Sequence, residues 1–90
     1  MLYVINYDIK DGARENAFMI KAETLGNTHI FMPRCMFLQC LNESKDKNSI
    51  FEDLKKTLNE EDLLLISNVP FKNMAGWLTS TAIDWLSIHK

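Results

Sequence analysis

The chain has little of what most simple function classes require. It contains only two cysteines and two histidines, ten basic against twelve acidic residues, and no apolar run long enough to span a bilayer. A formal charge of −2 provides no bulk attraction to nucleic acid, whose binding normally rests on many Lys and Arg contacts to phosphate. The N-terminus has no basic leader before its apolar run, so we expect no signal peptide and a cytoplasmic location.

The two cysteines, Cys35 and Cys40, lie five positions apart in one apolar segment. In a strand this odd spacing places them on opposite faces, so they cannot easily bridge each other. No second cysteine pair is present to complete a zinc site. We therefore predict two reduced, buried thiols, as is typical of a cytosolic protein.

Apolar residues are plentiful for so short a chain, at 47% of 90 residues. A chain of this length forms one small domain, here residues 1–90, and buries a smaller fraction of its surface than a larger protein does. We expect the excess apolar surface to lie in a subunit interface and predict a homodimer with no membrane contact.

Hydrophobic patterning predicts the order strand, helix, strand, strand, helix, strand and terminal helix. Pro33-Arg34 interrupts the apolar stretch at residues 28–41, which is either two short strands or one kinked strand. The expected strands cover residues 2–9, 29–32, 35–41 and 63–69, and the expected helices cover residues 13–25, the segment from residue 49 onward and the segment after residue 81.

This order is that of an α+β, ferredoxin-like βαββαβ fold. It predicts an antiparallel sheet in a core of residues 1–70, two helices on one face, and a tail of residues 71–90 with a short C-terminal helix. The other face of the sheet then needs its own cover. The tail and a second subunit are the two candidates.

Local signals predict where the helices begin and end. Asp11 is the expected N-cap of the first helix, and Gly26-Asn27 is its expected stop. Ser49 and Glu52 have the spacing of a capping box at the start of the second helix. Thr81 is the expected cap of the last helix.

Short motifs at both ends suggest a family. An apolar first strand that closes on Tyr7-Asp8-Ile9 resembles the second universal CRISPR-associated protein, the small homodimeric subunit of the spacer-integration complex. The tail departs from that pattern: Gly76-Trp77 followed by Trp85-Leu86 is more similar to bacterial proteins labelled SinR-like, and the virulence-associated protein D toxins share the architecture. The resemblance implies a homodimer in which Asp8 from both copies lies near the dimer axis and holds one divalent cation.

Asp8 is therefore the candidate catalytic and metal-binding residue. Two copies could bind Mg²⁺ and polarise a phosphodiester, with RNA as the substrate by analogy with the related toxins. The alternative is that Asp8 only caps the turn or helix that follows it. Asn6, on the same strand face, is either a supporting ligand or a polar residue at a strand end.

Three cations, Lys10, Arg14 and Arg34, could cluster near Asp8 and contact phosphate. The competing interpretation is that all three are solvated surface residues. A non-catalytic dimer that recruits a protein partner is accordingly the second functional hypothesis, and the acidic composition favours it.

Histidines and aromatic residues give no independent sign of chemistry. Neither His29 nor His89 is close to Asp8 in sequence, and no Ser–His–Asp arrangement or phosphate-binding glycine loop is present. Aromatic residues of the strands could stack on bases, although core packing is the more common role. We expect Trp77 and Trp85 to pin the tail onto the open sheet face or onto a partner subunit.

Overall fold

The computed structural model describes residues 1–89, and their elements follow the predicted order. Along the chain they are β1 (Leu2–Asp8), α1 (Gly12–Leu25), β2 (Gly26–Met32), β3 (Cys35–Cys40), α2 (Lys47–Lys55), β4 (Leu63–Asn68), the 3-10 turn η1 (Phe71–Asn73) and α3 (Ser80–His89). None of the helices in this part of the chain has the length and apolar character needed to cross a membrane.

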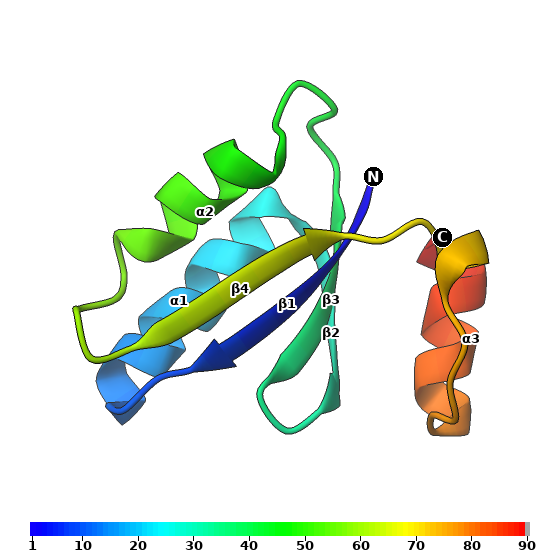
Figure 1. The fold of residues 1–90 in the computed structure, drawn as a ribbon, viewed down its shortest axis with the longest axis horizontal. Helices are drawn as coiled ribbons and strands as arrows, with labels where there is room; N and C mark the ends of the chain where they lie inside the picture. Colours follow the sequence, from blue (N-terminus) through cyan, green and yellow to red (C-terminus); the bar gives the residue numbers. More distant parts are fainter. Residues whose placement is uncertain (90) are drawn as a thin grey trace.

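The four strands form one sheet in the order β2-β3-β1-β4, with every neighbouring pair antiparallel. The result is a small α+β structure consistent with a ferredoxin-like fold. Figure 1 shows α1 and α2 together on one side of the sheet and α3 on the other. The residues Pro33-Arg34 form the turn between β2 and β3, so the interrupted stretch is two strands.

Side chains alternate between the two faces of the sheet, so Cys35 and Cys40 of β3 lie on opposite faces, as their spacing predicted. The main core lies beneath α1 and α2 and contains Tyr3, Ile5, Tyr7, Phe18, Ala22, Leu25, Met36, Leu38, Cys40, Ile50 and Leu54. The opposite face carries a smaller cluster of Leu2, Phe37 and Leu86, joined by Val4, Phe31, Met74, Leu78 and Trp85.

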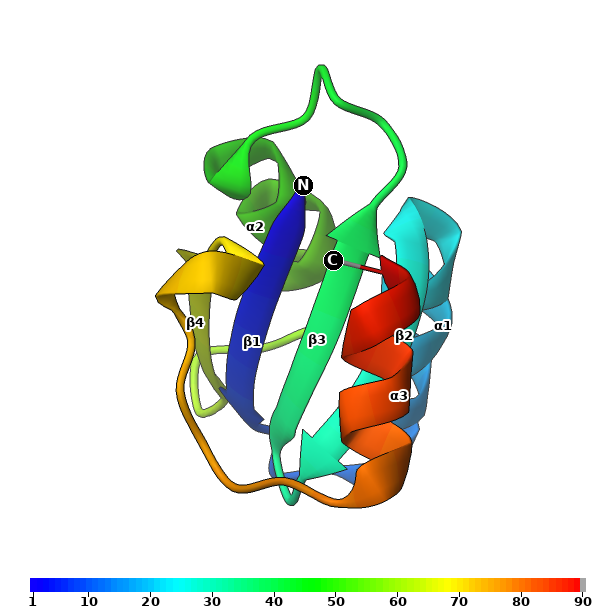
Figure 2. The same ribbon diagram turned by 90° about the vertical axis from the view of Figure 1, so that its right-hand side faces the viewer.

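The tail covers only part of that second face. Figure 2 shows α3 lying over the β2 and β3 side of the sheet, with the segment from η1 to α3 looping past the β4 side. Trp85 holds α3 in place by stacking on Phe37, with ring centroids 5.9 Å apart. Trp77 does not pin the tail to the sheet, because its side chain is 100% exposed. The expected sheet contact of Trp77 was wrong, and its contact with a partner stays a prediction.

α1 ends at Leu25 with Gly26 as its C-cap, as predicted, but Gly26 is extended and begins β2 directly, so the expected left-handed turn was wrong. A Cβ atom at residue 26 would overlap the backbone carbonyl of Gln39 on the neighbouring strand. Glycine is needed here for close packing of two backbones and not for a left-handed turn, since its φ of 165° is extended.

The helix caps were predicted correctly for α1 and wrongly for the other two helices. The Asp11 carboxylate accepts a hydrogen bond from the Arg14 N–H at 3.0 Å, as expected. In α2, Asp46 is the cap and accepts from the Ser49 N–H at 2.9 Å, so Ser49 lies inside the helix. In α3 the Thr79 hydroxyl accepts from the backbone N–H of Ala82 at 3.2 Å.

Candidate functional site

Asp8 lies at the end of β1, on the sheet face opposite α1 and α2, where it pairs with Leu63 of β4. Its carboxylate accepts a hydrogen bond from the Lys10 ammonium at 2.6 Å. This bond lowers the pKa of Asp8, and the nearby positive charge of Arg34 adds to the effect. Asp8 is therefore ionised at neutral pH, with an ammonium group already at its side.

The capping alternative for Asp8 is wrong. Asp11 caps the following helix, and the Asp8 carboxylate accepts no backbone hydrogen bond within residues 1–89. What the fold gives Asp8 is a half-exposed position beside one lysine. Such a group can take up a cation if Lys10 moves aside.

Asp8 shares a shallow hollow with Asn6, Arg34 and Cys35. Arg34 reaches this place because the turn holds it at φ 61°, in the left-handed region, while its carbonyl oxygen accepts from the Tyr7 N–H at 3.0 Å. The Asn6 amide contacts the Cys35 sulfur at 3.1 Å. The fold thus brings Lys10 and Arg34 close to Asp8, in agreement with the clustered alternative for these two cations.

Arg14 does not join this group, which corrects the expected cluster of three cations. Its guanidinium donates to Asp62 at 2.8 Å and to Glu61 at 2.8 Å, so these two acids neutralise it. Asp62 also accepts from the backbone N–H groups of Lys10 and Asn59, and its side chain is shielded from solvent. The Arg14 contact keeps the pKa of Asp62 well below its usual range.

The sequence did not identify Asp62 as the residue whose hydrogen bonds hold together the segments next to Asp8. It fixes the segment after β1 to the segment before β4 through backbone and side-chain bonds. The acidic run Glu60-Glu61-Asp62 immediately before an apolar strand was the only sequence signal for it. The role of Asp62 is to position the chain around Asp8 through its bonds to Lys10, Asn59 and Arg14.

A metal ion at Asp8 would need ligands beyond those that one chain provides. Within residues 1–89, no three His, Cys, Asp or Glu side chains are grouped closely enough to hold one. The two cysteines lie on opposite faces and are free, with Cys40 buried and Cys35 half-buried. A cation site would therefore have to combine Asp8 with groups from a second copy.

The histidines are far from Asp8 and belong to an aromatic stack around Trp85. The Trp85 ring lies 4.2 Å from His89 and 5.8 Å from His29 between centroids, with near-parallel planes. His29 comes from β2 and His89 from the last turn of α3, so the stack fastens that helix to the sheet. These ring contacts stabilise the packing of α3 against the sheet.

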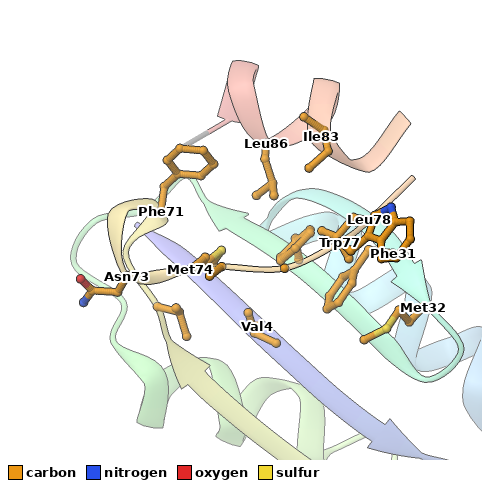
Figure 3. A pocket seen from close by; sticks show the side chains of 14 residues that line it. Val4, Phe31, Met32, Phe71, Asn73, Met74, Trp77, Leu78, Ile83 and Leu86 are labelled. Atoms are coloured by element: carbon orange, nitrogen blue, oxygen red, sulfur yellow. The ribbon is translucent and has the colours of Figure 1, made fainter. Parts of the chain in front are cut away.

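An apolar groove of about 630 Å³ opens on the second face of the sheet. It lies between the sheet, the segment that follows η1, and α3, and Figure 3 shows side chains from all three directed into it. Its lining is Val4, Phe31, Met32, Phe37, Val69, Phe71, Asn73, Met74, Ala75, Gly76, Trp77, Leu78, Ile83 and Leu86. Neither charge nor catalytic chemistry is present in that set, so it suits an apolar contact.

Two leucines extend the apolar surface beyond the groove. Leu63 and Leu65 of β4 are 63% and 62% exposed on the same sheet face.

Comparison of this chain with protein-family models, curated proteins and solved structures finds no match.

Proposed function

We propose that the chain is a non-catalytic, homodimeric interaction module. The observation that carries this proposal is the apolar surface left on the second sheet face, where Trp77 is exposed at the groove and Leu63 and Leu65 are exposed at the Asp8 hollow. Exposed apolar surface of this kind on a small domain is typical of a protein interface. In this proposal the dimer surface recruits a protein partner, and no reaction is required of it.

The direct test is the oligomeric state of the full chain at micromolar concentration. We expect light scattering to give a dimer for the parent protein and a monomer for Leu65→Lys, because a buried unpaired ammonium group is costly. Ile20→Lys is the matched control, since Ile20 has a similar exposure, 57%, but lies on α1. A monomeric parent protein would refute the homodimer.

Metal-dependent nuclease activity is the second candidate function, and the surroundings of Asp8 are what favour it. Asp8 is ionised and half-exposed, and it shares its hollow with Arg34, which could contact a phosphate. In this proposal Asp8 from each copy holds one Mg²⁺ ion near the dimer axis, which polarises the phosphodiester of an RNA substrate.

A nuclease assay with Mg²⁺ or Mn²⁺ distinguishes the two functions. Under the nuclease proposal, Asp8→Asn abolishes cleavage while the protein remains folded, and Glu23→Gln serves as a control acid on α1, away from the hollow. Cleavage at full rate by Asp8→Asn would remove this residue from any mechanism. Absence of cleavage by the parent protein would leave the interaction module as the function.

We also propose that the domain is ferredoxin-like and related to the SinR-like and CRISPR-associated small-subunit proteins. The strand order β2-β3-β1-β4 with two helices on one face supports the fold, and Asp8 at the end of β1 supports the relationship. A cytoplasmic location is supported by two free thiols, Cys35 and Cys40, which persist in a reducing compartment.

A further inference from the structure

Among residues 1–89, the backbone groups on the outer edge of β4 have no hydrogen-bond partners. The Val69 N–H donates to the Leu2 carbonyl oxygen at 3.1 Å. This bond shows which residues of β4 direct their backbone groups toward β1. In an antiparallel ladder every second residue bonds to the neighbouring strand. The residues in between, Leu64, Ile66 and Asn68, therefore direct their N–H and C=O groups away from β1.

No strand within residues 1–89 pairs with that edge, since β4 ends the sheet. Figure 1 shows β4 as the strand nearest the viewer, with no segment in front of it. Proteins normally protect such an edge with a charge, a proline or a bulge. The β4 sequence Leu-Leu-Leu-Ile-Ser-Asn has none of these, and its register with β1 is unbroken.

The other edge of the same sheet provides an internal comparison. β2 shifts register between Ile30 and Met32, and α3 packs against it through the stack of His29 on Trp85. A shifted and packed edge strand is poorly suited to pairing with another chain. The sheet is thus protected at β2 and left open at β4.

From this asymmetry we infer that β4 pairs antiparallel with β4 of a second copy, with Ile66 opposite Ile66 of the partner subunit. This register matches Leu64 with Asn68 of the partner subunit, so all three outward-facing residues of each strand gain partners. Three such pairs exchange about six backbone hydrogen bonds and join the two sheets into one. The inference rests on the proposed homodimeric interaction module and specifies which surface forms it. Because the two-fold axis passes Ile66 and Asp8 pairs with Leu63, this dimer keeps the two Asp8 carboxylates apart and is an alternative to the shared Mg²⁺ site.

Two residues of opposite charge near the ends of β4 are compatible with the same register. Glu60 precedes the strand and Lys72 follows it, and neither forms an ion pair within the described residues. Antiparallel pairing centred on Ile66 brings Glu60 of one copy to the end of the joint where Lys72 of the partner subunit lies. Leu63 and Leu65 from both copies then line one face of the joint, which removes apolar surface from water.

Residue-resolved amide exchange tests this pairing directly. At a concentration where the chain is dimeric, we expect the amides of Leu64, Ile66 and Asn68 to exchange at least tenfold more slowly than after dilution to monomer. The amides of Leu65 and Ser67, which bond to β1, should be protected under both conditions. A dimer in which the outward amides exchange as fast as in the monomer would overturn the inference while leaving the homodimer intact.

Asn68→Pro provides a second test, because proline removes an outward N–H and its ring obstructs the approach of another strand. We expect the dimer dissociation constant to rise at least tenfold for Asn68→Pro and to change little for Asn68→Ala, whose backbone is intact. Equal dissociation constants for Asn68→Pro and Asn68→Ala would refute edge pairing. If Asn68→Pro fails to fold, the exchange measurement on the parent protein decides. A monomeric parent protein would instead refute the homodimer itself.

Discussion

Replacing Trp85 by alanine should destabilise the protein far more than replacing Trp77, although both indoles belong to the tail. Trp85 is half-buried and stacks against His89, Phe37 and His29, with ring centroids 4.2, 5.9 and 5.8 Å away. Trp77 is 100% exposed. The two substitutions remove the same group from opposite environments, so each is the control for the other.

The expected magnitude follows from the burial of each ring. Truncating a fully buried Trp costs about 3–5 kcal/mol, and because part of the Trp85 ring stays in solvent we expect about 2–3 kcal/mol. In a domain of this size each kcal/mol lowers the Tm by about 4–8 °C, which gives a loss of about 8–24 °C. Trp77→Ala should change stability by no more than about 0.5 kcal/mol.

Thermal unfolding followed by circular dichroism, at one chain concentration for all three proteins, measures the difference. The helical signal of Trp85→Ala should also fall below that of the parent protein, because a helix as short as α3 depends on packing. A Tm for Trp85→Ala within about 2 °C of the parent would show that the stack does not hold α3. An equally large loss for Trp77→Ala would show that Trp77 is buried in the assembled protein.

Two further substitutions, Gly26→Ala and Asp62→Asn, test the close backbone packing at residue 26 and the ion pair between Asp62 and Arg14. Gly26→Ala should prevent normal folding or lower the Tm strongly, because its Cβ overlaps the Gln39 carbonyl, whereas Gly12→Ala meets open space and should have little effect in the same melt. The contact with Arg14 lowers the pKa of Asp62 in the folded state, so its stabilisation is complete above the unfolded value of about 3.9 and is lost as the pH falls below it. Tm measured from pH 7 to pH 2 should therefore decline less steeply in Asp62→Asn than in the parent protein, and equal slopes would contradict the proposed linkage.

Much of the fold could be predicted because its signals are local. Alternation along β1 assigned Tyr3 and Ile5 to one face and Leu2 to the other without knowledge of any partner strand. The Asp11 cap depends on a donor only three residues away. Properties of this kind are determined within one or two turns of chain, so the sequence contains all the information that they need.

The features that were missed depend on contacts between distant residues. Gly26 has the local signature of a helix stop, but its true constraint is the Gln39 carbonyl on another strand. Arg14 was placed near Asp8 because the two are close in sequence, whereas its partner Asp62 is 48 positions away. For α2, Asp46 and Ser49 are both good caps three residues apart, so composition could not distinguish between them.

The dimensions of helices and strands explain why the second sheet face stays half open. A helix with its side chains is about 10 Å across, and neighbouring strands lie about 4.8 Å apart, so one helix covers about two strands. On the first face α1 and α2 together are sufficient for four strands. On the second face α3 alone covers the β2 and β3 side, and the tail segment before it contacts the sheet-face cluster through Met74 and Leu78 while leaving the apolar groove open.

The uncovered half of that face contains β4, which is also the unprotected edge of the sheet. Exposed leucines and outward backbone groups therefore occur on the same strand, and one pairing event can cover both. A partner that docked only on the face would leave the N–H groups of Leu64 and Ile66 in solvent. Edge pairing in the proposed register satisfies them and also places Leu63 and Leu65, which are exposed in one copy, beside Val69 and Ser67 of the partner subunit. Edge pairing is thus the more favourable contact for this surface, because the same strand gains backbone hydrogen bonds and apolar contacts at once.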